Sequence, residues 1–411
     1  MTTPAIPLSE YATRRRRLST ALKKAVGVVF AGDHDAHLDH DFRPHPHFEY
    51  LTGLVDEPGA VVVLDPGNPV AARRELLFLR PLNPEVEKWD GYRLEVGKTL
   101  RAGTGFQAVF RTTHLPRFLS EAARRTGAVA CIHPLAQYDQ AVSPDLEIFR
   151  RLAERTPDLT ITDRTMTLAG HRSVKSRAEV AMIQHAVDIT RVGFETIMQS
   201  LGPGQNEFDV QSTLEHAYRT NGSRGPAFGS IVGSGINSTV LHYRANAKTI
   251  EKGDLVCIDS GAAFGGYGAD ITRTLPASGR FSARQKEVYT VVLRAMEAAI
   301  KKVAPGQTIA EIDKAARAII TKAGFGDFFI HGIGHHLGLE THDVNPDTPL
   351  REGAVVTIEP GVYLPDEALG VRIEDDVVVT KTGCRNLSAK IPKSVAAIEK
   401  MMGGSGRKTR G

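Results

Sequence analysis

The second half of the chain contains an internal repeat, which limits the fold more than any other feature of the 411 residues. The segment 251–261 (EKGDLVCIDSG) matches 351–361 (REGAVVTIEPG), 100 residues further on. Each copy is an apolar strand that ends in a carboxylate and a Gly-containing turn. Repeated segments fold into the same unit and pack together to bury their apolar faces. We therefore expect one domain built from two halves related by a pseudo-twofold axis.

The helices that precede each repeated strand recur as well. Capping boxes at Ser176–Glu179 and Ser282–Gln285 predict the starts of two long amphipathic helices. Each helix ends at a stretch rich in Gly and Pro, and a second helix follows. This order predicts an α+β domain with the same plan in both halves.

Residues 1–168 have a different pattern of apolar and polar residues. Apolar runs predict buried strands at 26–30, 60–64 and 76–79. They alternate with helical stretches at 14–25 and 115–125, which is typical of an α/β domain. Because 163–174 is polar, we place a boundary there, between an N-terminal domain (1–168) and the repeat-containing domain (169–403), followed by a basic, flexible tail (404–411).

Composition excludes several classes of protein. The chain has 51 Lys and Arg against 47 Asp and Glu, too balanced to indicate a nucleic-acid partner. No apolar run approaches the ~20 residues that cross a bilayer, and no signal peptide is recognisable, so we expect no membrane partner. The three cysteines are far apart and form neither a disulfide framework nor a zinc knuckle, which favours the cytoplasm.

Four carboxylates and two histidines occupy equivalent positions in the two repeats. Asp259 matches Glu359, Asp270 matches Glu374, and His242 matches His342. Taken singly, each acid could be a surface residue at a strand end. At repeat-related positions, however, the four would meet at the centre of the domain, where buried carboxylates are costly without a cation. The pattern therefore predicts a site for one or two divalent metal ions, which can hold a water for hydrolysis.

The segment 331–343 (HGIGHHLGLETHD) places four histidines within twelve residues. Histidine is a common nitrogen ligand and general acid or base, and the nearby glycines let the backbone approach closely. His336 has no role that we can assign, and we expect it to be structural.

These residues resemble the five-ligand dinuclear site of the "pita-bread" metallopeptidases, and the whole chain is similar to aminopeptidase P. The similar motifs are Ile231–Asn237, Leu241–Tyr243, Gly253–Leu255, Ile258–Gly261, Tyr267–Thr274, His331–Asp343, Ile358–Tyr363 and Gly370–Asp376. Phe48–Leu54 resembles the family's non-catalytic N-terminal domain, which methionine aminopeptidases lack. The resemblance implies an α/β N-terminal domain followed by an α+β pita-bread catalytic domain.

The resemblance also implies a ligand set. Asp259 would chelate one metal, His335 and Glu359 would hold the other, and Asp270 and Glu374 would bridge the two. This oxygen-rich shell suits Mn²⁺, with Co²⁺ or Zn²⁺ as alternatives. A bridging water or hydroxide would attack the scissile carbonyl, and Glu359 or Glu374 would manage its proton.

Four further residues receive roles from the resemblance. His242 and His342 would flank the scissile carbonyl and stabilise the tetrahedral intermediate. His331 would contact the substrate near the scissile bond. Arg372, two residues before Glu374 and so on the same strand face, would pair with that carboxylate and orient it.

The implied activity is that of an Xaa-Pro aminopeptidase, which releases the N-terminal residue from peptides that have proline second. A prolidase, which cuts only Xaa-Pro dipeptides, would share every ligand. The short stretch 363–372 favours aminopeptidase P, because prolidases often carry an insertion there. A catalytically inactive homologue that binds peptides or proteins is disfavoured, since all five ligands are present. Relatives imply a homodimer or homotetramer.

Three other features have a structural interpretation that requires no role in catalysis. We expect the His- and Asp-rich segment 33–47 to be a polar loop, and Trp89 to pack locally within its own loop. For each, the alternative is that it reaches the active site of a neighbouring subunit. We expect Cys257 to be a core thiol.

Overall fold

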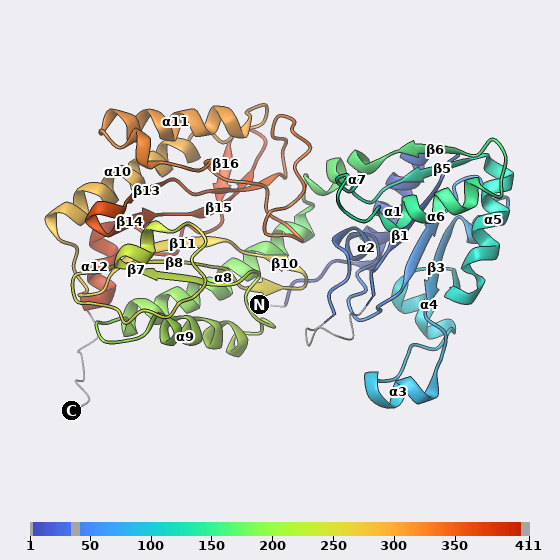
Figure 1. The fold of residues 1–411 in the computed structure, drawn as a ribbon, viewed down its shortest axis with the longest axis horizontal. Helices are drawn as coiled ribbons and strands as arrows, with labels where there is room; N and C mark the ends of the chain where they lie inside the picture. The colour runs from blue at the N-terminus through green and yellow to red at the C-terminus, as the bar shows by residue number, and fades with distance from the viewer. Residues whose placement is uncertain (1–2, 34–41, 404–411) are drawn as a thin grey trace. The chain divides into compact units, whose positions relative to one another are not determined.

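The computed structural model describes residues 3–33 and 42–403 (Figure 1). They form two compact units. The first is Ile6–Arg172, and the second is Ser173 onward together with residues 3–5. The division falls at the end of α7 (Thr165–Arg172), whereas the boundary expected at 168 lies within this helix. The proposed tail and His34, His37 and His40 lie outside the described residues.

The first unit contains a six-stranded mixed sheet with the order β4-β3-β2-β1-β5-β6. Its strands are β1 (Val26–Phe30), β2 (Val61–Leu64), β3 (Glu75–Leu79), β4 (Ala108–Arg111), β5 (Ala128–Cys131) and β6 (Thr160–Asp163). β1 pairs antiparallel with β2 and parallel with β5. The predicted α/β class is confirmed.

Helices cover this sheet, which explains why its central strands are continuous apolar runs. The helices are α1 (Leu8–Leu22), α2 (Pro46–Thr52), α3 (Pro84–Asp90), α4 (Lys98–Thr104), α5 (Leu115–Thr126), α6 (Pro144–Ala153) and α7. On one face, Leu119 of α5 and Phe149 of α6 join a buried cluster with Val28 and Phe78 of the sheet.

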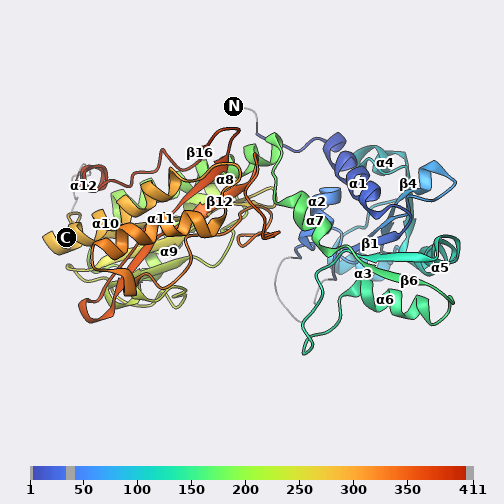
Figure 2. The ribbon, with the colours of Figure 1, turned by 90° about the horizontal axis from the view of Figure 1, so that it is seen from above.

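The second unit has two pairs of helices. They are α8 (Arg177–Ser200) with α9 (Glu207–Thr220), and α10 (Ala283–Ile300) with α11 (Ile309–Lys322); α12 (Val395–Gly403) follows. Both predicted capping boxes are present, at Ser176 and Ser282. The first pair lies on one side of the strands and the second on the other (Figure 1), and Figure 2 looks down on α10 and α11 side by side. None of the helices within residues 3–33 and 42–403 is long and apolar enough to cross a bilayer.

The strands of this unit repeat as the sequence predicts. They are β7 (Ile231–Ser234), β8 (Leu255–Ser260), β9 (Ala263–Phe264), β10 (Tyr267–Gly268) and β11 (Ile271–Pro276), then β12 (Val355–Ile358), β13 (Gly361–Leu364), β14 (Leu369–Arg372), β15 (Asp375–Val379) and β16 (Cys384–Asn386). In the first half β8 pairs antiparallel with β11, and the β9–β10 hairpin lies between them in sequence. In the second half β12 pairs antiparallel with β15 around the β13–β14 hairpin.

The four candidate carboxylates lie at the bases of these two hairpins. Asp259 is in β8 and Asp270 directly precedes β11, while Glu359 follows β12 and Glu374 precedes β15. The second hairpin is longer, which explains why the repeat offset grows from 100 to 104 residues. Each half of the domain therefore contributes one pair of acids.

Candidate active site

A cavity of about 580 Å³ in the second unit brings the candidate residues together. Its lining includes Asp259, Asp270, His335, Glu359 and Glu374, together with His242, His331, His342 and Arg372. These side chains come from both halves of the repeat.

His335 faces the carboxylates with one ring nitrogen. Its Nε2 lies 3.5 Å from Asp270 Oδ2 and 3.5 Å from Glu359 Oε1. Its Nδ1 lies 3.0 Å from the carbonyl oxygen of His336. Because a carbonyl only accepts, Nδ1 carries the proton and the lone pair of Nε2 points at the acids, as in a metal ligand. One ligand atom each from Asp270, His335 and Glu374 can be chosen so that all three lie within 4.8 Å of one another.

Thr357 of β12 holds His335 in this place through both its side chain and its backbone. The His335 N–H donates to Thr357 Oγ1 at 3.0 Å, and the Thr357 N–H donates to the His335 carbonyl at 2.9 Å. Gly334 has φ +154°, and a Cβ there would lie 2.1 Å from the carbonyl oxygen of Thr357. Only glycine permits this approach, which brings His335 beside Glu359, the residue that follows β12.

Burial and neighbouring charges shift the pKa values of the candidate metal ligands. Burial, and then the charges of Glu374 and Asp259, raise the pKa of Asp270 well above its usual value. Burial, and then the charge of Glu359, do the same to the pKa of Glu374, and burial raises the pKa of Glu359 to about 7. Burial also lowers the pKa of His335 to about 4, so its ring is neutral at pH 7, the form that binds a metal.

The donor set fits divalent cations. Four carboxylates and one neutral imidazole offer mainly oxygen ligands, and a cation would offset the charge that raises the carboxyl pKa values. Asp259 Oδ1 is buried and, within the part of the chain that the structure describes, has no hydrogen-bond partner. An acceptor placed in this way is available to a metal.

Arg372 has a different partner from the one expected. Its Nη2 donates to Asp259 Oδ2 at 2.8 Å, and its Nε donates to Thr272 Oγ1 at 3.2 Å. The Thr272 hydroxyl in turn donates to Glu374 Oε2 at 2.7 Å. The guanidinium therefore orients Asp259 directly and reaches Glu374 through Thr272.

Thr272 and Tyr363 are site residues that the sequence reasoning did not assign. Thr272 lies two residues after Asp270, so strand alternation could have placed both on one face. Tyr363 belongs to one of the matched motifs. Its hydroxyl accepts from Arg372 Nη1 at 3.0 Å and lies 2.8 Å from His331 Nε2.

The histidines of the cavity are held in different ways. His331 Nδ1 lies 2.8 Å from the carbonyl oxygen of Gly332, so both of its ring nitrogens are engaged within the protein. Burial lowers the pKa of His331 to about 4. The His342 ring stacks on His335, with centroids 3.9 Å apart and planes 16° apart. His242 is exposed at the cavity wall.

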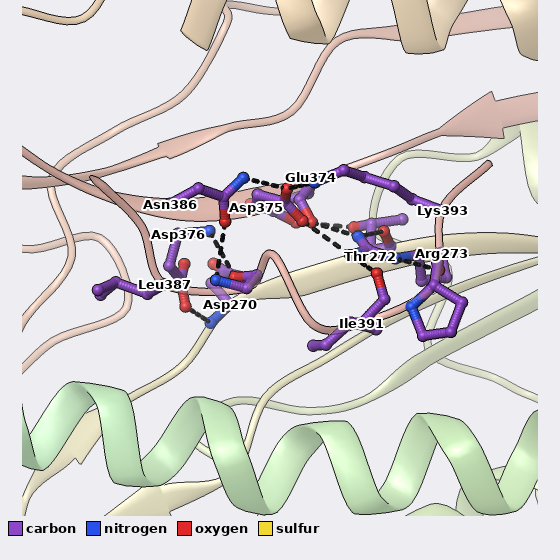
Figure 3. Close-up of polar contacts among 12 residues, drawn as sticks. Asp270, Thr272, Arg273, Glu374, Asp375, Asp376, Asn386, Leu387, Ile391 and Lys393 are labelled. Carbon is purple, nitrogen blue, oxygen red and sulfur yellow. Dashed lines mark hydrogen bonds and ion pairs between the residues drawn. The ribbon is translucent and has the colours of Figure 1, made fainter. Parts of the chain in front are cut away.

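A buried network of ion pairs and hydrogen bonds adjoins Asp270 and Glu374 (Figure 3). Arg273 is fully buried, and its Nη1 donates to the carbonyl oxygens of Thr272 at 2.8 Å and Glu374 at 2.6 Å. Its Nη2 donates to Asp375 Oδ1 at 2.7 Å, and Lys393 forms a second ion pair with Asp375. The guanidinium thus joins the two strand segments that carry ligands.

The other expectations have mixed outcomes. Trp89 is 89% exposed on α3, so the expected local packing is wrong. His47 is buried within α2 and contacts Arg172, so the segment 33–47 is not entirely a polar loop. Cys257 is buried in β8 as expected, and His336 is buried outside the cavity lining.

Comparisons with known proteins agree with this site. The model of metallopeptidase family M24 matches residues 181–381, and that of the aminopeptidase P N-terminal domain matches 11–130. The chain is 32% identical to an Xaa-Pro aminopeptidase of Haemophilus influenzae over 435 residues, which covers 97% of this chain and 98% of the relative. Aminopeptidase P of Escherichia coli, solved with the inhibitor Pro-Leu, has a TM-score of 0.88 and 30% identity, covering 97% of this chain and 99% of that one.

A more local match is to an Xaa-Pro dipeptidase of Pyrococcus furiosus, 40% identical over 222 residues. It covers 53% of this chain and 63% of the relative. The match to metallopeptidase family M24 spans the whole cluster of acids and the imidazole of His335, so the protein is a metallopeptidase. The chain belongs to the aminopeptidase P family of M24 metallopeptidases, since the similarity extends over nearly its whole length.

Proposed function

We propose that the protein is an Xaa-Pro aminopeptidase, which releases the N-terminal residue from peptides with proline in second position. The observation that supports this most strongly is the single cavity shared by all five candidate metal ligands and the three histidines of the matched motifs. The similarity to an Xaa-Pro aminopeptidase along nearly the full chain supports the same substrate class.

Asp259, Asp270, His335, Glu359 and Glu374 would hold two divalent ions, with His335 the one nitrogen donor. The predominance of oxygen donors favours Mn²⁺ over Zn²⁺ or Co²⁺. When bound, two such ions lower the pKa of a water molecule and polarise the substrate carbonyl.

Glu359 is the better candidate for the proton acceptor. Its side chain is 18% exposed at the cavity, whereas that of Glu374 is buried and already accepts from Thr272. As in any amide hydrolysis, the proline nitrogen of the scissile bond leaves as an amine only after gaining a proton. Glu359 can take the proton from the attacking water and return it to that nitrogen.

The histidines complete the proposed machinery. His242 and His342 donate N–H groups to the carbonyl oxygen as negative charge develops on it. His331, with both nitrogens engaged, shapes the wall beside the scissile bond. Arg372 keeps Asp259 oriented and holds Tyr363 against His331.

An Xaa-Pro dipeptidase is the second candidate, because the dipeptidase of Pyrococcus furiosus has the higher identity over its shorter match. The β13–β14 hairpin is closed by only the short turn Pro365–Glu367 and Ala368. The absence of an insertion there favours the aminopeptidase.

Matched substrates distinguish the two candidates. The protein is stripped with a chelator, reloaded with Mn²⁺ and given Xaa-Pro dipeptides and Xaa-Pro-Yaa tripeptides in parallel. We expect tripeptide cleavage that is lost in the metal-free protein and in Glu374→Gln, but kept in Glu367→Gln, an exposed glutamate outside the cavity. Cleavage of dipeptides alone would establish the dipeptidase, and no cleavage with metal bound would reject both.

We also propose that the enzyme acts in the cytoplasm as a homodimer or homotetramer. All three cysteines are free thiols, as expected in a reducing compartment. Sedimentation equilibrium of the metal-loaded protein measures the number of subunits, and a monomer would contradict the assembly.

A further inference from the structure

Among the described residues, one guanidinium group that lines the cavity, that of Arg244, makes no hydrogen bond or ion pair within the protein. The lining includes two arginines, Arg244 and Arg372. Arg372 is buried and paired with Asp259. Arg244 is exposed, and across residues 3–33 and 42–403 no hydrogen bond or ion pair engages its side chain. A free cation therefore stands at the wall of a cavity whose interior holds four carboxylates.

The position of Arg244 leaves its charge open to the cavity. Its side chain lies across Gly229, where an added Cβ would be 3.8 Å from both Cδ and Nε of Arg244. Gly229 has no side chain to cover the guanidinium. Phe228, the next residue, lines the same cavity and gives this part of the wall an apolar neighbour.

The spacing from His242 sets which part of a peptide Arg244 can reach. Arg244 lies two residues after His242, so their Cα atoms are at most about 7 Å apart. In a tripeptide cut after its first residue, the terminal carboxylate also lies two residues beyond the scissile carbonyl, again about 7 Å away. This step depends on the proposed function, in which His242 flanks that carbonyl.

We propose that Arg244 binds the C-terminal carboxylate of Xaa-Pro-Yaa tripeptides and makes the enzyme selective for short peptides with a free C-terminus. A guanidinium matches a carboxylate with two parallel hydrogen bonds. Longer or amidated peptides lack a carboxylate at this point.

The test compares Xaa-Pro-Ala with its C-terminal amide. Wild type, Arg244→Gln, Arg244→Lys and the control Arg294→Gln, an exposed arginine of α10 outside the cavity, are assayed with both peptides. We expect the ratio of kcat/KM for the acid to kcat/KM for the amide to fall about tenfold in Arg244→Gln, which corresponds to about 1.4 kcal/mol. The fall should come mainly from a higher KM for the acid. Arg244→Lys should restore part of the ratio, and the control should keep it. The wild-type ratio should also fall at high salt, because an exposed charge is screened.

Each other result rejects a defined part of the proposal. Equal ratios in wild type and Arg244→Gln, with both peptides cleaved, would overturn the role of Arg244 and leave the proposed function intact. If Arg244→Gln lost activity only toward Xaa-Pro dipeptides, Arg244 would bind a carboxylate one residue nearer the scissile bond. The proposal for tripeptides would then be rejected. A similar loss with Xaa-Pro-Glu amide would show that a side-chain carboxylate is bound instead. If wild type cleaved neither peptide, the proposed function would fail and this inference with it.

Discussion

Replacing Thr272 with valine removes one hydroxyl beside the metal ligands and leaves the side-chain volume nearly unchanged. That hydroxyl donates to Glu374 Oε2 at 2.7 Å and accepts from Arg372 Nε at 3.2 Å. Thr272 is fully buried, so water cannot replace either contact. The substitution therefore leaves the Glu374 carboxyl group and the charged Arg372 guanidinium without this partner.

Thr272→Val should lower both the stability of the protein and its affinity for Mn²⁺. A hydrogen bond to a charged group contributes about 1.5–3 kcal/mol, so Thr272→Val should lower the free energy of unfolding of the metal-free protein by about that amount. Loss of a residue that orients a metal ligand typically weakens binding about 10–100-fold, and we expect Mn²⁺ affinity to fall within this range.

Thr274→Val is the matched control. Thr274 lies two residues along β11 and is also fully buried, but its hydroxyl bonds the backbone of Arg372, at 2.9 and 3.1 Å, and the Cys257 side chain rather than a candidate metal ligand. We expect a comparable loss of stability and a Mn²⁺ affinity within about threefold of wild type, since no ligand is contacted. Urea denaturation measures the stability and isothermal titration calorimetry the affinity. Equal losses of affinity in the two variants would refute the role given to Thr272.

Two further predictions concern buried charges. Lys175 Nζ lies 3.0 Å from Asp343 Oδ2, and both side chains are 1% exposed. Lys175→Met should therefore lower the free energy of unfolding, measured by urea denaturation, by about 3–5 kcal/mol, and adding Asp343→Asn should recover part of this loss. An unchanged free energy of unfolding in Lys175→Met would contradict this prediction. Burial raises the pKa of Glu359 to about 7, so folded metal-free protein holds this proton more tightly than the unfolded chain does. The stability of wild type relative to Glu359→Gln should therefore fall as pH rises from about 4.5 to about 7, and a difference that stayed constant with pH would be inconsistent with the raised pKa.

Local signals in the sequence predicted most of the fold. The run 26–30 coincides with β1, because a strand buried on both faces is apolar throughout. The helix expected at 14–25 is instead α1, Leu8–Leu22. Its first turn carries polar residues that an apolar pattern does not detect, and it ends where Lys23 adopts a left-handed φ of 58° without a glycine to signal the stop.

The repeat predicted which carboxylates would meet, but not how they would be held. The two-residue spacing between Arg372 and Glu374 predicted that Arg372 faces the site, yet its partner depends on the pairing of other strands. The register of β8 with β11 sets Asp259 opposite Thr272, and this brings both within reach of the guanidinium. Such contacts between distant segments are not visible in the pattern of any one strand.

The most direct test of the account is to titrate Mn²⁺ into metal-free protein while mass spectrometry follows an Xaa-Pro-Yaa tripeptide. Five ligands shared by two ions predict no cleavage before metal is added and a rate that reaches its plateau at two ions per chain. The only products should be the first residue and the Pro-Yaa dipeptide. Full activity without metal, or cleavage after the proline, would contradict the assignment.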